Sequence, residues 1–260
     1  MKVEYAPKGL IGLLTPQANT TVEPEFSILM PAGYAHINAR LVSQATSIEL
    51  RLVDYFRIAS QTLMQFANAP IEALALGCTG ASYLAGRENE EKLLSELSEM
   101  RGVPAFTAAS ALVDFLAEMG VHKIALATPY PEALTQTSVG YWESHGLTVV
   151  KTASAAIDDT EFHPIYSLSA KQADGVLDQL GTLSGVDAVV MLGTGMPTLQ
   201  PVLASNLARR RVPVLSCMLA LAWKSVEVID PGKYPIQDWL TGKHWASRLE
   251  SSKVEKFNEK

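Results

Sequence analysis

The sequence predicts an α/β fold built from two similar lobes related by a pseudo-twofold axis, each an open, mostly parallel sheet flanked by helices. Two observations predict this fold. Short apolar runs alternate with helix-length segments along most of the 260 residues, and such alternation is typical of parallel sheets. In addition, motifs of the first half of the chain recur in the second half at a nearly constant spacing.

The predicted strands are short apolar runs, and several of them are continuously apolar instead of alternating. Continuous apolar runs are expected for parallel strands that are covered on both faces. The eight expected strands are residues 10–14, 36–42, 71–76, 105–107, 123–127, 148–152, 188–192 and 214–216.

The segments between these strands have the length and composition of helices. Gly120 and Gly146 follow two of them and are typical helix-ending residues. Glu23 and Glu25 are interpreted as charges at a helix start and not as catalytic acids, and residues 243–260 as a solvated or frayed helix. The expected helices are residues 48–68, 88–101, 109–119, 131–145, 169–180, 198–210 and 218–228.

The internal repeat is visible in three pairs of motifs. The stretch "EALALGCTG" from Glu72 aligns without gaps with "DAVVMLGTG" from Asp187, "VPAFTAASALVDF" aligns with "VPVLSCMLALAWK", and "LLTPQ" aligns with "LATPY". Three matches in the same order predict a duplicated chain. We expect residues 1–108 with 217–245 to form the first lobe, residues 109–216 the second, and residues 246–260 a C-terminal tail.

The duplication predicts a cleft between the lobes. In open parallel sheets the ligand crevice lies at the carboxyl ends of the strands, so each lobe would send its strand-end loops into a shared site. The loop around Pro16 would face the loop at Tyr130, and the loop of Cys78 would face that of Gly193.

Composition narrows the class of protein. Hydrophobic residues make up 48% of the chain and charged residues 18%, which supports a sizeable core. The net charge of −6, without a basic stripe beyond Arg209, Arg210 and Arg211, argues against a nucleic-acid partner. We interpret the three arginines as charges at a helix end.

No apolar stretch reaches the ~20 residues that span a bilayer, and the first residues do not resemble a signal peptide. The two cysteines do not suggest a disulfide framework, and the histidines show no metal-ligand spacing. No phosphate-loop or dinucleotide fingerprint is present. We therefore expect a soluble cytoplasmic protein without a membrane partner, cofactor or metal; a homo-oligomer is compatible with the sequence.

Cys78 is the candidate catalytic residue. It directly follows a predicted buried strand and stands between Gly77 and Thr79-Gly80; glycines allow close backbone approach to a ligand, and N–H groups after such a strand can bind an anion. A thiol with an unperturbed pKa of ~8.5 can be tuned to serve as acid, base or nucleophile. The alternative is a small buried hydrophobe, and this is how we interpret Cys217.

Three motifs resemble the maleate isomerase and arylmalonate decarboxylase branch of the aspartate/glutamate racemase superfamily. They are "GLLTPQANTTVEPEF" from Gly12, "LGCTGASYLAG" from Leu76 and "LATPY" from Leu126, and the resemblance extends through "VPVLSCMLALAW". It implies the duplicated two-lobe fold and an enzyme that needs no cofactor or metal.

The resemblance also implies roles for individual residues. Racemases and isomerases of this superfamily carry one cysteine in each lobe; Cys78 matches the first, whereas Gly193 stands at the place of the second. The decarboxylases have one thiol in the second lobe, so this chain resembles their mirror arrangement. The remaining substrate-binding residues expected from the motifs and loops are Pro16, Asn19, Thr20, Thr79, Gly80, Tyr130 and Thr194.

Three functions remain open at this point, all for a small mono- or dicarboxylic acid. The first is decarboxylation of a malonate-like diacid, in which Cys78 protonates the enediolate; one thiol is sufficient, so Gly193 favours it. The second is a maleate-type cis–trans isomerase or a racemase with Cys78 as nucleophile or base. The third is a non-catalytic protein that binds carboxylates.

Overall fold

The computed structural model describes residues 3–156, 164–208 and 212–252. These residues form two four-stranded sheets in which every paired strand is parallel. The first sheet has the order β2-β1-β3-β4 and contains β1 (Gly9–Pro16), β2 (Tyr34–Leu41), β3 (Ala73–Leu76) and β4 (Ala105–Thr107). The second has the order β6-β5-β7-β8 and contains β5 (Lys123–Thr128), β6 (Thr148–Ser154), β7 (Ala188–Met191) and β8 (Val214–Ser216). The two halves of the chain thus share one strand order, which confirms the predicted fold class.

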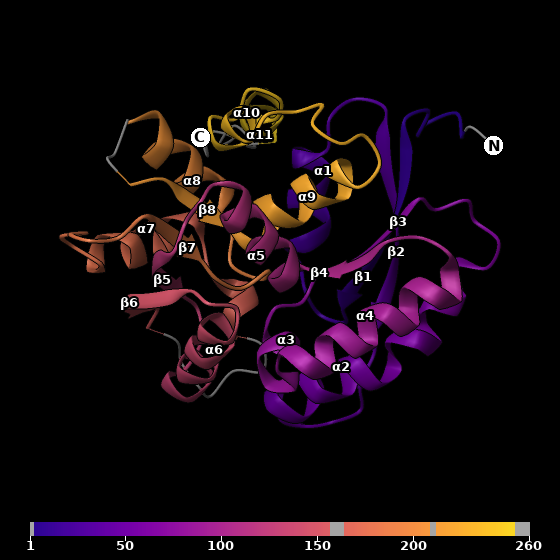
Figure 1. Ribbon diagram of the computed structural model, residues 1–260, viewed down its shortest axis with the longest axis horizontal. Helices are drawn as coiled ribbons and strands as arrows, with labels where there is room; N and C mark the ends of the chain where they lie inside the picture. Colours follow the sequence, from indigo (N-terminus) through magenta and orange to yellow (C-terminus); the bar gives the residue numbers. More distant parts are fainter. Residues whose placement is uncertain (1–2, 157–163, 209–211, 253–260) are drawn as a thin grey trace, which may run out of the picture.

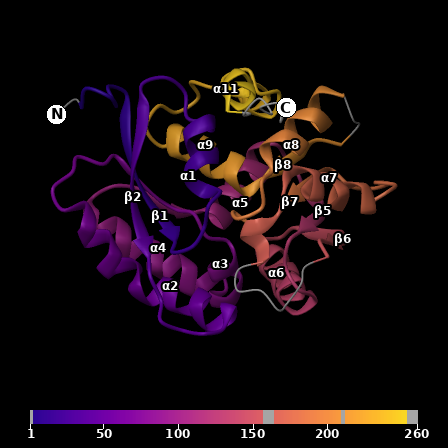
Figure 2. The ribbon, with the colours of Figure 1, turned by 180° about the vertical axis from the view of Figure 1, so that it is seen from behind.

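Helices lie on both sides of each sheet (Figures 1 and 2). The helices of the first half are α1 (Val22–Leu29), α2 (Ile48–Leu63), α3 (Gly80–Ala85), α4 (Arg87–Arg101) and α5 (Ala108–Glu118). Those of the second half are α6 (Glu132–Ser144), α7 (Ala170–Gln179), α8 (Leu199–Leu207), α9 (Cys217–Glu227), α10 (Ile236–Leu240) and α11 (Ala246–Ser251). Short 3₁₀ segments cover Met64–Phe66 and Pro164–Ser167.

The central strands explain why their sequences are continuously apolar. Every residue of β1, β3 and β7 is buried, because helices cover both faces of each sheet. A polar side chain on such a strand would be buried away from water, which costs free energy unless the side chain finds a hydrogen-bond partner. The carboxyl ends of these strands carry the polar loops of the candidate site.

Helices α5 and α9 pack against each other at the centre of the molecule (Figure 1). Each begins directly after the last strand of its half, and a hydroxyl caps each start: Thr107 accepts hydrogen bonds from the Ala109 and Ser110 amides, and Ser216 accepts one from the Leu219 amide. The rings of Phe115 and Trp223 meet edge to face, 5.0 Å apart. This apolar junction fixes one sheet relative to the other.

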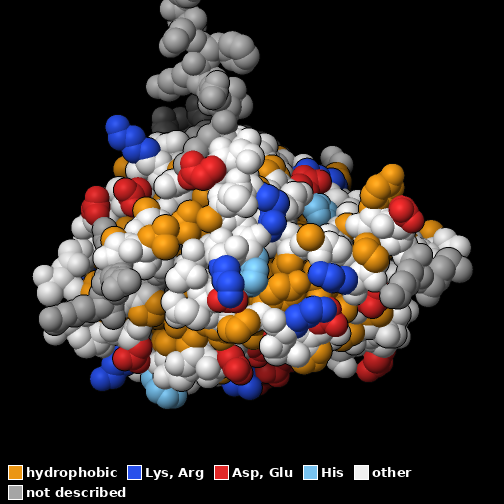
Figure 3. Space-filling view, turned by 90° about the horizontal axis from the view of Figure 1, so that it is seen from above, with side chains coloured by type: hydrophobic (Ala, Val, Ile, Leu, Met, Phe, Trp, Pro, Cys, Tyr) orange, Lys and Arg blue, Asp and Glu red, His pale blue; other side chains and the backbone are white. Residues whose placement is uncertain are grey.

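The outer surface shows no extended region of a single charge on the face seen in Figure 3, where acidic and basic side chains are interspersed with apolar ones. Within the described ranges, no helix has both the length and the apolar character needed to cross a membrane.

A few predicted elements differ from the observed ones. The helix expected over residues 48–68 ends at Leu63 and continues as the 3₁₀ turn, which closes at Ala67 with a φ of 43°. The helix expected over 198–210 spans Leu199–Leu207. The prediction omits the short helices α3 and α10, and the arginine cluster at 209–211 lies outside the described residues.

Candidate active site

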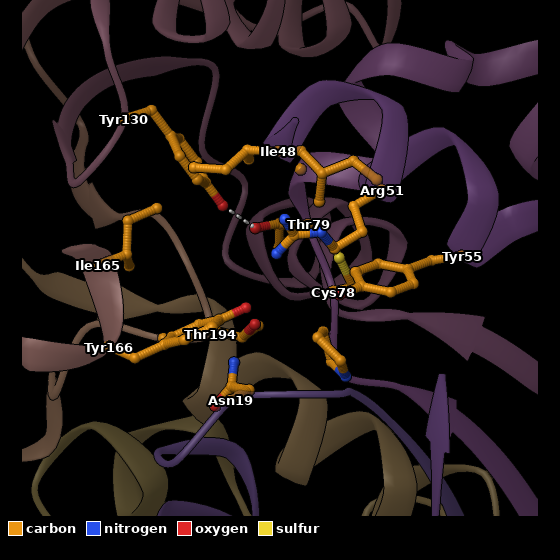
Figure 4. A pocket seen from close by; sticks show the side chains of 14 residues that line it. Asn19, Ile48, Arg51, Tyr55, Cys78, Thr79, Tyr130, Ile165, Tyr166 and Thr194 are labelled. Carbon is orange, nitrogen blue, oxygen red and sulfur yellow. Dashed lines mark hydrogen bonds between the residues drawn. The ribbon is translucent and has the colours of Figure 1, made fainter. Parts of the chain in front are cut away.

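A small pocket lies at the carboxyl ends of the strands, with walls from both halves of the chain (Figure 4). Its cavity measures about 40 Å³, which is room for on the order of three water molecules. Helix α2 and the loops after β1 and β3 form one side, and the loops after β5, β6 and β7 form the other. The lining residues are Pro16, Asn19, Ile48, Arg51, Leu52, Tyr55, Cys78, Thr79, Gly80, Tyr130, Ile165, Tyr166, Thr194 and Gly195.

The pocket brings together most of the residues expected from the sequence. Two expected residues do not line it. Thr20 is exposed, and its hydroxyl donates a 3.4 Å hydrogen bond to the Tyr166 carbonyl. Gly193 has a φ of +83°, and a Cβ atom placed on it would lie 2.5 Å from Cγ of Pro129. The expected residues that do line it are Pro16, Asn19, Cys78, Thr79, Gly80, Tyr130 and Thr194.

Cys78 lies two residues after the end of β3, and its side chain is 5% exposed. Burial raises the pKa of the thiol to about 11, although hydrogen bonds from the Ala81 and Gly80 amides act in the opposite direction. The sulfur is therefore a protonated thiol at neutral pH. The same two amides stabilise negative charge on the sulfur once the thiolate forms.

Hydroxyl groups from both lobes meet beside this thiol. The hydroxyls of Thr79 and Tyr130 are 2.8 Å apart, and burial raises the pKa of Tyr130 well above its usual value, which keeps it a neutral donor. The Thr194 hydroxyl donates to the Gly77 carbonyl at 2.8 Å. This hydrogen bond links the loops after β3 and β7, so the hydroxyl proton of Thr194 does not point into the cavity.

Asn19 is held in place by the start of α1. Its side-chain oxygen accepts hydrogen bonds from the amides of Thr21 and Val22, at 2.8 and 3.0 Å. Because the oxygen is occupied, the side-chain NH₂ is the group available to a carboxylate. Figure 4 shows this nitrogen on the side of Asn19 that faces Thr194 and Tyr166.

Sequence analysis missed Arg51 and Tyr55, which reach the pocket from α2. Both side chains are buried, at 1% and 2% exposure, and Figure 4 draws both next to the Cys78 sulfur. Arg51 is the charged residue among the described pocket residues. A signal was present: Ile48, Arg51, Leu52 and Tyr55 follow the 3–4 spacing of one helix face, so a cation falls on an apolar stripe.

Tyr166 was also missed, because it belongs to the 3₁₀ segment after β6 and not to a strand-end motif. Burial is the main cause that raises its pKa, and Cys78 and Tyr55 are among the groups that act on it electrostatically. A Cβ atom on Gly195 would lie 2.5 Å from the Tyr166 ring. The glycine after Thr194 thus allows the ring to close over the pocket.

Cys217 lies behind the pocket and does not line it. Its side chain is fully buried, and burial raises the pKa of the thiol to about 12, partly opposed by hydrogen bonds that involve the Gly193 amide and the Tyr83 and Thr79 hydroxyls. It therefore packs at the base of the site. No group of three acidic, histidine or cysteine residues suited to a metal ion occurs in the described part of the chain.

The geometry combines one nucleophilic atom with neutral donors and one cation in a nearly closed cavity. Such a set can bind a small carboxylate and stabilise charge that develops on it. The thiol can then add to carbon or transfer a proton.

Comparisons with known proteins show which family the chain belongs to and support its fold. The chain is 28% identical over 238 residues to a maleate isomerase from Alcaligenes faecalis, covering 84% of this chain and 89% of the relative. The crystal structure of the maleate isomerase Iso from Pseudomonas putida S16 superposes with a TM-score of 0.79 at 22% identity, covering 90% of this chain and 98% of that one, which supports the fold.

A third structure is that of a Nocardia farcinica maleate cis-trans isomerase in which one cysteine is replaced by serine; it holds a covalently bound succinylcysteine intermediate. Its TM-score is 0.75 at 25% identity, covering 85% of this chain and 93% of that one. The family model for arylmalonate decarboxylase matches residues 11–236. The chain therefore belongs to the arylmalonate decarboxylase family of enzymes.

Proposed function

We propose that this protein isomerises the double bond of a small cis-unsaturated dicarboxylic acid, with Cys78 as the nucleophile. The observation that carries the proposal is the cavity itself, in which one thiol faces neutral hydroxyl and amide donors from both lobes. The curated relatives are maleate isomerases and support the choice among the family's reactions.

The reaction requires one thiolate, which forms when the Cys78 thiol loses its proton to solvent before the addition, and it needs no net proton transfer to carbon. The sulfur of Cys78 adds to one alkene carbon, and the electron pair of the double bond moves to the other carbon and its carboxylate, giving an enediolate. The former double bond is now single and rotates. The enediolate then collapses, the carbon–sulfur bond breaks, and the trans diacid and the thiolate are released.

Donors beside Cys78 are suited to the enediolate. The paired hydroxyls of Thr79 and Tyr130 and the amide of Asn19 are held by neighbouring groups before any substrate binds. Donors fixed in advance lose little reorganisation energy when charge develops, and this is usually the largest contribution to such catalysis.

Gly193 does not exclude this route. A two-base racemisation needs a group on each face of the substrate, but thiolate addition needs one. In the Nocardia protein, one cysteine is replaced by serine and a succinylcysteine is still formed, so the remaining sulfur supports that adduct. By analogy, the single thiol in our pocket is sufficient for the addition step.

Decarboxylation of a malonate-like diacid is the second candidate. It is favoured by one specific observation, the raised pKa of Cys78, because a protonated thiol is ready to donate its proton to an enediolate. In that reaction the carbon–carbon bond to the departing carboxylate breaks, carbon dioxide leaves, and Cys78 delivers one proton to the remaining carbon.

Proton NMR in heavy water separates these functions. We expect maleate to convert to fumarate without carbon dioxide release, and substituted malonates to remain unchanged. Loss of carbon dioxide with one deuterium incorporated would instead establish the decarboxylase, and no turnover of either acid class would leave a binding protein. Cys78→Ser is the matched control, since it keeps the shape of the site and removes the sulfur; we expect its rate to fall by about 10³-fold or more.

A further inference from the structure

The turn from Pro16 to Asn19 follows β1 and brings both of these residues to the wall of the pocket. The backbone amide of Asn19 donates to the Pro16 carbonyl at 3.0 Å, which closes the turn. Asn19 is 2% exposed, and its side-chain NH₂ is the group that a carboxylate in the pocket can reach. The position of the turn therefore decides where this donor stands before a substrate binds.

An arginine outside the pocket holds this turn. Arg40 belongs to β2, pairs with Thr15 in the register of the first sheet, and does not line the cavity. Its Nη1 donates to the Pro16 carbonyl at 3.1 Å and to the Asn19 carbonyl at 2.8 Å. One planar group thus bridges the first and the last carbonyl of the turn.

The second arm of the same guanidinium reaches helix α1. Its Nη2 forms an ion pair with the carboxylate of Glu23, which lies in the first turn of that helix. The start of α1 also supplies the amides of Thr21 and Val22 that hold the side-chain oxygen of Asn19. The charge of Arg40 is therefore balanced by Glu23. Its planar fork fixes the turn and the helix start relative to each other.

We propose that Arg40 is a positioning residue that fixes the Asn19 amide as a donor for the enediolate formed at Cys78. The inference rests on the proposed function, because the enediolate is the state in which this donor matters most. Donors fixed in advance stabilise developing charge only in the correct geometry. The enediolate carries more negative charge on its oxygens than the carboxylate of the bound acid, so a loosened turn should lower kcat more than it raises KM.

Steady-state kinetics of maleate isomerisation test this role. Arg40→Met keeps most of the alkyl stem and removes the donated contacts, and we expect kcat to fall about 10- to 100-fold with KM changed by less than about 3-fold. Arg57→Met is the matched control, because the Arg57 side chain is 75% exposed and lies outside the active-site pocket; its kcat should equal that of the wild type. An unchanged kcat in Arg40→Met would overturn the proposal.

A double-mutant cycle shows whether Arg40 acts through Asn19. Asn19→Ser removes the side-chain NH₂ and keeps an oxygen that can accept from the amides at the start of α1. In that background, Arg40→Met should lower kcat by less than about 3-fold, because the donor that Arg40 positions is already absent. A loss as large as in the wild-type background would mean that Arg40 only supports the fold, and the proposal would be rejected.

Arg40→Lys keeps the test decisive if Arg40→Met does not fold. An ammonium group can retain the ion pair with Glu23, but it lacks the planar fork that reaches two carbonyls and a carboxylate at once. We therefore expect kcat to fall in Arg40→Lys as well. A kcat equal to that of the wild type would contradict the bridging role.

A measurement without turnover separates this inference from the proposed function. In an amide NMR spectrum of nitrogen-labelled protein, the side-chain NH₂ signals of Asn19 are identified by their absence in Asn19→Ser. We expect these signals to shift or broaden in Arg40→Met and to stay unchanged in Arg57→Met. Failure of maleate turnover together with that shift would remove the proposed reaction and leave the positioning role intact. Unchanged Asn19 signals in Arg40→Met would overturn the positioning role itself.

Discussion

At the scale of single residues, both proposed reactions depend on the protonation of Cys78. Burial raises the pKa of its thiol to about 11, so a fraction on the order of 10⁻⁴ is thiolate at pH 7. The nucleophilic form becomes more abundant as pH rises, and the proton-donating form stays constant until the pKa is approached.

The pH dependence therefore distinguishes the two reactions. If Cys78 attacks as thiolate, kcat/KM for maleate should rise about tenfold per pH unit between pH 7 and 10. A proton donor would give a rate that is flat over that range and falls above about pH 11. Initial rates measured across the range test this, and a flat profile would contradict the nucleophile.

Residue 193 lacks a thiol, and its backbone conformation also favours glycine. Its φ of +83° and the 2.5 Å approach of Pro129 to a Cβ atom both disfavour a side chain. We expect Gly193→Cys to lower the free energy of unfolding by about 1–3 kcal/mol and not to increase turnover. Gly175→Ala, at an exposed site where a Cβ meets nothing, is the control for thermal denaturation. A Gly193→Cys protein as stable as the wild type would refute the conformational argument.

At the scale of elements, helix α1 supplies the cap of helix α8. Glu25 is buried, and its carboxylate accepts hydrogen bonds from the Thr198 and Leu199 amides at 2.7 and 3.3 Å. Glu25 lies in the first turn of its own helix, as sequence analysis expected, and in addition it accepts hydrogen bonds from amides at the start of another helix across the lobe junction. Burial is the main cause that raises its pKa to about 7; the hydrogen bonds from the two amides and a third from the Thr198 hydroxyl act in the opposite direction.

This carboxyl makes stability depend on pH. The pKa in the folded state, about 7, exceeds the ordinary value of 4.5, so the stabilising contribution is complete below pH 4.5 and is lost as pH rises through 7. The change amounts to about 3 kcal/mol. Urea unfolding at pH 4.5 and 8 should show this loss in the wild type and not in Glu25→Gln. Glu23→Gln, on the same helix, should behave as the wild type; an identical pH dependence in all three proteins would contradict the assignment.

The sequence predicted most elements because their patterns are local. Buried strands such as β3 and β7 have continuously apolar sequences. Helices such as α4 end at glycines with positive φ. Helix α3 was missed because it has six residues, too few to show a helical period.

Sequence analysis predicted those pocket residues that directly follow the end of a strand. Cys78, Thr79 and Tyr130 belong to motifs at these ends. Arg51 and Tyr166 come from a helix face and from a 3₁₀ segment, and their arrival at the pocket depends on tertiary packing that no local pattern encodes.

At the scale of the whole molecule, hydrogen bonds between the two halves of the chain surround the pocket. Besides the Thr79–Tyr130 pair, the Thr21 hydroxyl donates to the Gly195 carbonyl at 2.9 Å. Because Thr21 does not line the pocket, this bond contributes to lobe closure without contacting substrate.

Removing that bond should loosen the closed arrangement. We expect Thr21→Val to lower the free energy of unfolding by about 1 kcal/mol or more, because a buried carbonyl loses its partner. Thr20→Val changes an adjacent exposed hydroxyl with a 3.4 Å contact and should have little effect. Urea midpoints of both variants provide the measurement, and equal midpoints would argue against a stabilising role for the Thr21 bond.

The small size of the cavity affects the fate of the reaction intermediate. A chamber of about 40 Å³ has room for on the order of three water molecules, which is less than a four-carbon diacid of eight heavy atoms occupies, so the pocket has to widen around such a ligand and leaves no space for bulk solvent beside it. Protonation of the carbanionic carbon by solvent would give a saturated thioether on Cys78, which has to lose that proton again before the sulfur can leave. In the proposed isomerisation, exclusion of the medium from the pocket would favour bond rotation and expulsion of sulfur over that protonation.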